Sequence, residues 1–115
     1  MTPDSEAPRG EAPEVDRVIH EPARYSIMAL LYVVEEADFL FVKNRTGLTA
    51  GNLSSHLAKL EAAGYVAIGK KFLKKKPHTS LRVTAGGRAA FDTYRERMKE
   101  LFTTLPEIGK ESENE

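Results

Sequence analysis

The chain of 115 residues contains no cysteine. Without thiols it cannot form disulfides, iron–sulfur clusters, cysteine-bound zinc sites or a thiolate nucleophile. Long apolar runs are also missing, because no stretch reaches the roughly 18 apolar residues of a membrane-spanning helix. Residues 1–17 have no apolar segment of the kind that marks a secretory signal. We therefore expect a cytoplasmic protein with no membrane partner.

Motifs for catalysis and for cofactors are missing as well. The sequence has no nucleophile elbow, no glycine-rich phosphate loop and no pair of carboxylates in a plausible cleft. Gly86–Gly87 matches no cofactor motif and is typical of a helix entry. The histidines have no recognised metal-ligand spacing; they are His20, His56 and His78. We expect neither enzymatic activity nor a cofactor or metal.

Large apolar side chains are scarce at both ends of the chain. Residues 1–16 are acidic and contain three prolines, so they cannot bury enough apolar surface to offset the entropy of ordering. Residues 106–115 are similarly polar. We therefore predict one domain over residues 17–105, flanked by two disordered tails.

The net charge of zero hides a strong segregation of charge along the chain. Residues 1–38 carry nine acidic and three basic side chains, a net charge of −6. Residues 39–82 carry nine basic side chains and the single acid Glu61, a net charge of +8. Residues 83–115 have a net charge of −2. The middle of the chain is therefore as basic as many nucleic-acid-binding modules.

Two helices are expected in the first half of the chain. A helix over 22–37 is predicted by apolar residues at i, i+3, i+4 and i+7; these are Ile27, Leu30, Leu31 and Val34. A shorter helix over 37–46 has Asp38 as its expected N-cap and Gly47 at its C-terminus.

The third helix, over 49–64, has the clearest pattern. Thr49 suits an N-cap, and Gly64 suits the left-handed position after a helix. Its leucines recur at i, i+4 and i+7 and form one ridge that we expect to be buried; they are Leu53, Leu57 and Leu60.

A hairpin and a last helix complete the pattern. Residues 65–73 and 80–84 have strand character, with a basic turn over 74–79 between them. The last helix is predicted over 84–104, with Pro106 ending it. Three helices, a hairpin and a helix predict a mostly α fold with a small β-hairpin wing, the winged helix-turn-helix.

The motifs support that fold with a family resemblance. The run from Leu48 to Val66 (LTAGNLSSHLAKLEAAGYV) resembles the recognition-helix signature of small winged helix-turn-helix regulators related to the MarR and ArsR groups. The wing over 75–84 (KKPHTSLRVT) and the helix entry over 84–88 (TAGGR) match too. The resemblance implies a homodimer that binds duplex DNA and usually represses transcription. The long acidic tail and the dense lysine cluster depart from the family pattern.

The outward face of the third helix is small, polar and lightly basic, which suits the major groove. Asn52 has the side chain to pair with an adenine, and Lys59 can reach guanine acceptors or a phosphate. For His56 two interpretations remain open, a half-buried packing side chain or a phosphate contact. The two-stranded wing is expected to reach the minor groove or the flanking backbone, and its lysines suit phosphates rather than bases. The candidate DNA contacts are Arg45, Thr49, Asn52, Ser54, Ser55, His56, Lys59, Lys70, Lys71, Lys74, Lys75, Lys76, His78 and Arg82.

The first and last helices have more apolar surface than a small domain needs, so we predict that they form a dimer interface. A two-fold dimer places two recognition helices about one DNA turn apart, which predicts a pseudo-palindromic site. The candidate interface residues are Ile27, Leu31, Tyr94, Met98, Leu101 and Phe102. A small-molecule effector would have to bind beside that interface, and no residue pattern indicates one.

Two alternatives follow from the same charges. A winged helix can also serve protein–protein or RNA contacts, because fold does not fix function. The acidic tail over 1–16 either competes with DNA for the basic wing or only solubilises the chain.

Overall fold

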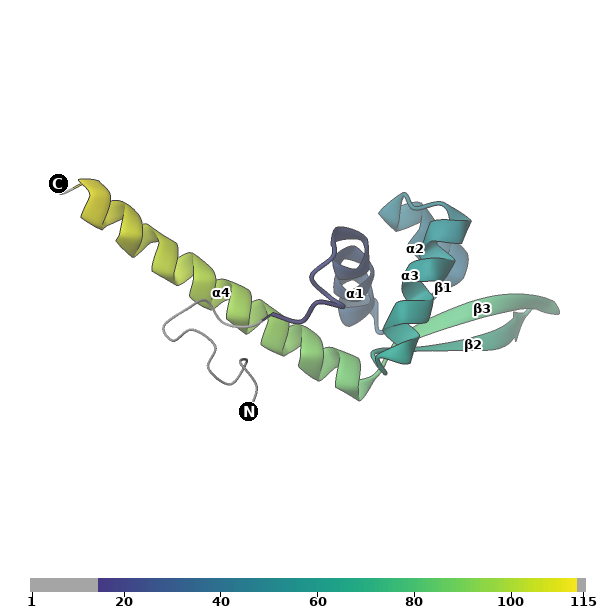
Figure 1. Cartoon of the computed structure of the whole chain (residues 1–115). Coiled ribbons are helices and arrows are strands. Elements are labelled where there is room, and N and C mark those ends of the chain that lie inside the picture. The colour runs from purple at the N-terminus through teal and green to yellow at the C-terminus, as the bar shows by residue number, and fades with distance from the viewer. Residues whose placement is uncertain (1–14, 114–115) are drawn as a thin grey trace, which may run out of the picture.

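The computed structural model describes the backbone of residues 15–113 and side chains up to Thr103; residues 1–14 of the predicted tail over 1–16 lie outside the described residues. The elements, in order, are α1 (Pro22–Val34), β1 (Glu36–Asp38), α2 (Phe39–Thr46), α3 (Ala50–Ala62), β2 (Val66–Leu73), β3 (Lys76–Val83) and α4 (Ala85–Glu113). Helices α1 to α3 form the body, with the β2–β3 hairpin projecting on one side and α4 extending on the other (Figure 1). The predicted winged helix-turn-helix fold is confirmed.

Local side-chain chemistry sets the N-termini of three helices, and the predicted caps of α2 and α3 are confirmed. Asp38 accepts a hydrogen bond from the Leu40 N–H and caps α2, and Thr49 caps α3 through the Asn52 N–H. Thr84 Oγ accepts from the Gly87 N–H at 2.9 Å and caps α4. Each cap satisfies a donor that a helix N-terminus leaves without an intrahelical partner.

One hydrophobic core joins the helices to the base of the hairpin. The predicted leucine ridge of α3 is buried, and it packs with side chains from α1, α2, the hairpin and α4. The other core residues are Ile19, Ile27, Met28, Leu31, Val42, Val66, Leu81, Val83, Phe91 and Tyr94. Because the ridge faces inward, the opposite side of α3 faces solvent.

The chain between α1 and α2 differs from the prediction. Helix α1 ends at Val34 rather than near residue 37, because Glu35 has a left-handed φ of 71°. The next three residues form β1, which pairs antiparallel with β3 in a sheet of order β1-β3-β2. A strand this short shows no periodicity, and only its distant partner β3 stabilises it.

The wing is longer and its turn tighter than predicted. Strand β2 pairs with β3 from Val66↔Val83 to Leu73↔Lys76, so only Lys74 and Lys75 form the turn. Residues 76–79, expected in the turn, belong to β3. Pro77 is tolerated there because β1 reaches only as far as Ser80 along β3, which leaves that side of β3 as an edge.

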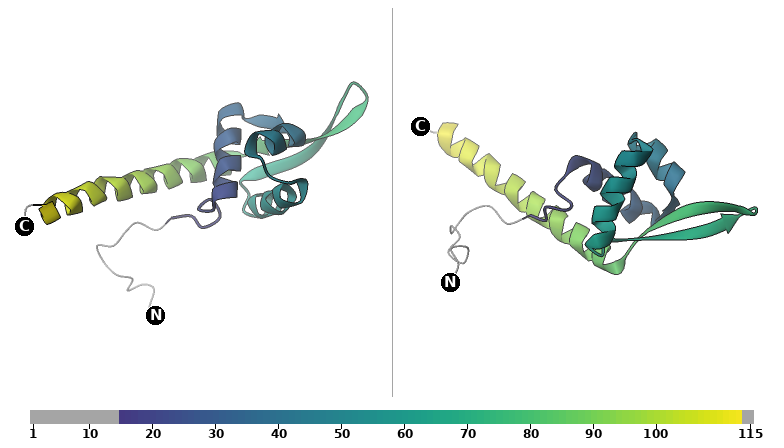
Figure 2. Two further views of the ribbon diagram at one scale, coloured as in Figure 1. Left: turned by 90° about the horizontal axis from the view of Figure 1, so that it is seen from above. Right: turned by 45° about the vertical axis from the view of Figure 1, so that its right-hand side comes forward.

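Helix α4 runs to Glu113, so the predicted end near Thr104 and Pro106 is wrong. That prediction rested on the backbone hydrogen bond that a proline removes from a helix, and this loss does not end α4. Figure 2 shows α4 as one continuous helix leading away from the hairpin. In the part of the chain that the structure describes, no helix is long and apolar enough to cross a membrane.

The segment before α1 is part of the fold, which places Asp16 inside the domain rather than in a tail. Asp16 Oδ1 accepts from the backbone N–H of Val18 at 2.8 Å, and its Oδ2 accepts from Tyr65 Oη at 2.5 Å. This hydrogen bond to a carboxylate is the main reason that the pKa of Tyr65 is raised to about 12. Ile19, three residues on, is fully buried.

Candidate nucleic-acid interface

The outward side of α3 is a continuous polar surface. Thr49, Asn52, Ser54, Ser55 and Lys59 are all exposed, as the leucine ridge requires. Thr49 also caps the helix, which is the role that its residue type favours. The exposed side chains are short apart from Lys59, so the helix backbone can approach a groove closely.

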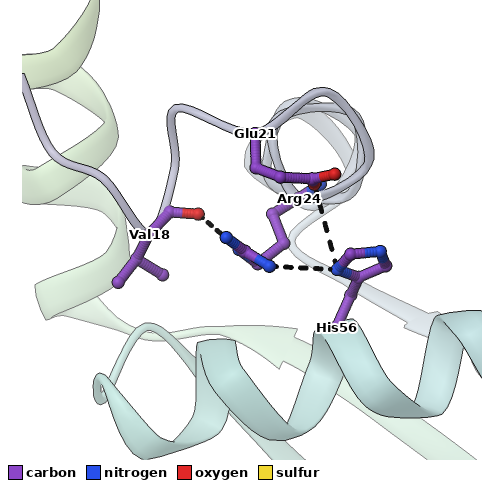
Figure 3. A network of polar contacts seen from close by, with 4 residues as sticks. All are labelled: Val18, Glu21, Arg24 and His56. Atoms are coloured by element: carbon purple, nitrogen blue, oxygen red, sulfur yellow. Dashed lines mark hydrogen bonds and ion pairs between the residues drawn. The ribbon is translucent and has the colours of Figure 1, made fainter.

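His56 lies at the edge of α3 and packs against α1 (Figure 3). Its Nδ1 lies 3.1 Å from Arg24 Nη1, and Arg24 Nε donates to the Val18 carbonyl at 2.6 Å. Because a guanidinium only donates, His56 Nδ1 accepts the hydrogen bond. The side chain is 21% exposed, so the geometry favours the packing interpretation of His56 over a phosphate contact.

Glu21 completes this network between α1 and α3. It accepts a hydrogen bond from the Arg24 N–H at 2.8 Å as the N-cap of α1, and its Oε1 lies 3.8 Å from His56 Nδ1. The Arg24 N–H holds the pKa of Glu21 below its usual value, and the positive charge of Arg24 acts in the same direction. The network ties the segment before α1 to the helix that carries the polar surface.

The wing lysines fall into two groups. Lys70, Lys74, Lys75 and Lys76 are exposed, and none of them joins an ion pair within residues 15–103. Lys71 instead forms an ion pair with Glu36 of β1. These four lysines lie in the turn or within four residues of it, and we call them the tip lysines.

Two acids, Glu36 and Asp38, hold the base of the wing, a role that the sequence pattern did not predict for either of them. Glu36 accepts from Ser80 Oγ at 2.5 Å and from Lys71, and the Lys71 contact is the main cause of its lowered pKa. Asp38 Oδ1 lies 2.9 Å from His78 Nδ1. Lys71 and His78, predicted as DNA contacts, therefore bind the protein's own acids. The spacing of two between Glu36 and Asp38 is the one signal in the sequence that these carboxylates share a strand face.

The two predicted arginine contacts are both exposed but lie apart. Arg45, in the last turn of α2, has its guanidinium carbon 5.3 Å from the centre of the Phe41 ring. Arg82 is directly opposite Glu36 in the β1–β3 register, at the base of the wing. Arg82 lowers the pKa of Glu36 through its charge. It therefore belongs to the part of the wing that Glu36 and Asp38 hold, rather than to the tip.

The six predicted interface residues separate into core and surface. Ile27 and Leu31 are fully buried and Tyr94 is 7% exposed, so these three are core residues of one protomer and offer no surface to a second. Met98 and Leu101 are half-buried, whereas Phe102 is 66% exposed. Beside them α1 and α4 form an open groove of about 870 Å³, lined among others by Tyr25, Met98 and Phe102.

Comparisons with known proteins agree with this architecture. A family model described as a winged helix DNA-binding domain matches residues 23–102. An uncharacterized protein of Methanocaldococcus jannaschii is 38% identical over 78 residues, which is 68% of this chain and 85% of that protein.

Solved structures share the fold. A transcriptional regulator homologue from Pyrococcus horikoshii OT3 superposes with a TM-score of 0.74 at 28% identity, covering 78% of this chain and 89% of that one. A MarR-family transcriptional regulator from Silicibacter pomeroyi has a TM-score of 0.59 at 18% identity, covering 76% of this chain and 58% of that one.

Proposed function

The chain belongs to the winged helix DNA-binding domain family, and from that premise we propose that it is a homodimeric transcriptional repressor that reads duplex DNA with α3. The observation that carries the proposal is the exposed polar side of α3, backed by its buried leucine ridge and accompanied by a wing with four lysines that join no ion pair within residues 15–103. A major groove about 12 Å wide accepts such a helix.

Within the groove, base reading is assigned to Asn52 and Lys59. The Asn52 amide can donate to and accept from an adenine at the same time, and Lys59 can donate to guanine acceptors or to a phosphate. Ser54 and Ser55 serve either bases or phosphates, and Arg45 serves the backbone beside them. His56 acts through Arg24 to fix the position of α3 rather than by touching DNA.

The tip lysines supply affinity rather than sequence preference, because an ammonium on a flexible stem is a point charge for phosphates. Lys71 and His78 are assigned to holding the wing through Glu36 and Asp38. If a dimer neutralises about 6–10 phosphates, its affinity for DNA falls by about 10³–10⁵ between 50 and 200 mM salt.

Dimerisation is assigned to the part of α4 beyond the core. Met98, Leu101 and Phe102 present an apolar surface there that no element of the described chain fully covers. A closed two-fold arrangement pairs this surface with itself and predicts a pseudo-palindromic operator.

The test is fluorescence anisotropy with duplex fragments that the wild-type protein selects from genomic DNA. The double variant Asn52→Ala/Lys59→Ala should lose at least about tenfold in affinity, since each bidentate base contact contributes about 1–3 kcal/mol. The matched control Ser26→Ala/Arg17→Ala removes one hydroxyl and one positive charge at exposed positions outside α3, and it should bind like wild type.

Thermal unfolding by circular dichroism checks that both double variants fold. Equal affinity of Asn52→Ala/Lys59→Ala and wild type would overturn the role given to α3. Single-stranded DNA and RNA of the same sequence serve as competitors. Stronger competition by either one than by unlabelled duplex would replace the duplex proposal with an RNA or single-strand function.

A further inference from the structure

The far end of the wing carries large apolar side chains that the described chain leaves uncovered. Phe72 is 72% exposed and Leu73 is 52% exposed. Phe72 pairs directly with Pro77 across the hairpin, so these two residues lie on the same face of the sheet. An exposed phenylalanine beside an exposed proline forms a compact apolar surface at the tip of the wing.

That surface continues the core-facing side of the hairpin. Side chains alternate along a strand, so Phe72 shares a face with Ile68 and with Val66, which is buried against the core. Burial decreases outward along β2 because the hairpin projects beyond the helices (Figure 2). Burial in the core of the single chain therefore explains why position 66 is apolar, but it does not explain an apolar side chain at position 72.

Charge around the tip restricts what can cover it. The four tip lysines each lie within two residues of Phe72 or Pro77 along the hairpin, and none of these ammonium groups has an ion-pair partner within residues 15–103. An apolar protein surface would have to desolvate these charges without compensation, which is costly. The charges instead favour a polyanion that offers an apolar recess between its charged groups.

We propose that Phe72, with Pro77 beside it, inserts into the minor groove of the bound duplex as an apolar wedge, while the tip lysines hold the phosphates on either side. This inference rests on the proposed DNA-binding function and assigns sequence-independent DNA deformation to the wing. The minor groove is about 6 Å wide with phosphates along both edges, and phenylalanine is among the side chains that open base steps there. Because the hairpin ends in a two-residue turn, Phe72 lies close to its tip, and this side chain rather than the two-stranded ribbon enters the groove.

A tryptophan reporter tests the contact directly, because the chain contains no tryptophan. The Phe72→Trp variant should change its emission intensity and wavelength when a random-sequence duplex of about 30 base pairs (three helical turns) is added. The control Val33→Trp, at a position on α1 that is 78% exposed, should not respond. The same titrations with phosphatidylserine vesicles distinguish DNA from an anionic lipid surface.

A truncation measures the contribution of the wedge without changing charge. Phe72→Ala should weaken duplex binding about tenfold, as expected for loss of one aromatic–base contact, and should leave the slope of affinity against salt unchanged. Lys75→Ala should instead reduce that slope by about 1 for each contact removed. Because Phe72 is exposed, its truncation should not lower the thermal midpoint.

The outcomes separate this inference from the function on which it rests. Suppose that wild type binds duplex but Phe72→Ala binds equally well, or that the emission of Phe72→Trp does not change when duplex is added. Either result would overturn the proposed insertion of Phe72 and leave the DNA-binding function unaffected. A Phe72→Trp response to vesicles alone reassigns the tip to a membrane surface. Absence of duplex binding by wild type overturns the proposed function itself.

Discussion

At Gly87, helix α4 approaches the backbone of Tyr65 too closely to leave room for a Cβ. A Cβ at this position would lie 2.9 Å from the carbonyl carbon of Tyr65 and closer still to its oxygen. Both are backbone atoms that cannot move aside, and the Tyr65 carbonyl also accepts the Thr84 N–H at 3.0 Å. Gly87 therefore lets α4 begin directly against the segment that joins α3 to β2, and the absence of a side chain at this position sets where α4 lies.

The Gly87→Ala variant should be less stable than wild type by about 1–3 kcal/mol, the usual cost of overpacking. Gly86→Ala is the control, because a Cβ there meets its nearest atom at 3.6 Å. That control should be neutral or slightly stabilising, since alanine favours a helix by about 1 kcal/mol over glycine. Urea unfolding of both variants makes the comparison. Equal stabilities would show that the close approach of α4 to Tyr65 relaxes without cost.

Residue type alone predicted several side-chain roles and missed others for a physical reason. The caps Asp38 and Thr49 bond to an N–H two or three residues away, so the local sequence contains both partners. His56 bonds to Arg24, which is 32 residues away. Such a contact depends on how two helices pack, so the local sequence leaves both interpretations of His56 open.

At the scale of elements, β1 was missed and it changes the roles of two wing residues. Helices and the hairpin could be predicted because their periodicity extends over eight or more residues. Strand β1 has three residues and gains its stability from β3, more than 40 positions away. Without β1, Lys71 is indistinguishable from Lys70 in the sequence, although only Lys71 binds Glu36.

The link between Glu36 and the wing should depend on pH. The hydrogen bond from Lys71 and that from Ser80 lower the pKa of Glu36, so its ionised form stabilises the folded state. This contribution is present above the unfolded carboxyl pKa of about 4.3 and is lost as pH falls through the lowered folded pKa. Wild type should be more stable than Glu36→Gln at neutral pH, and the two should converge in acid.

Thermal unfolding of wild type and Glu36→Gln between neutral pH and about pH 3 measures this convergence, with Glu61→Gln as the control. Glu61 is the exposed acid of α3 and joins none of the ion pairs recorded in the described chain. Its substitution should give no pH-dependent difference of this kind. A Glu36→Gln difference that stays constant down to low pH would show that its carboxylate charge does not hold the wing.

At the scale of the molecule, the two proposed partners occupy different ends. The wing projects from one side of the helical body, and α4 leads away from the other (Figure 1). The charge follows the same division, because the +8 segment 39–82 contains α2, α3 and the wing. A second protomer on the far part of α4 therefore leaves α3 and the wing free for DNA.

Phe102 provides the test of that division, since it is 66% exposed and lies beyond the core. Phe102→Glu should leave the single chain folded but place a carboxylate against the apolar surface of a partner, where burying its charge without a partner is costly. Light scattering should then show a monomer, and affinity for a two-half-site duplex should fall by about 10² or more as bivalency is lost. Val33→Glu, at a 78% exposed position on α1, should remain dimeric and bind DNA normally. A dimeric Phe102→Glu protein would place the interface elsewhere, and a monomeric one with full affinity would show that each half-site is read alone.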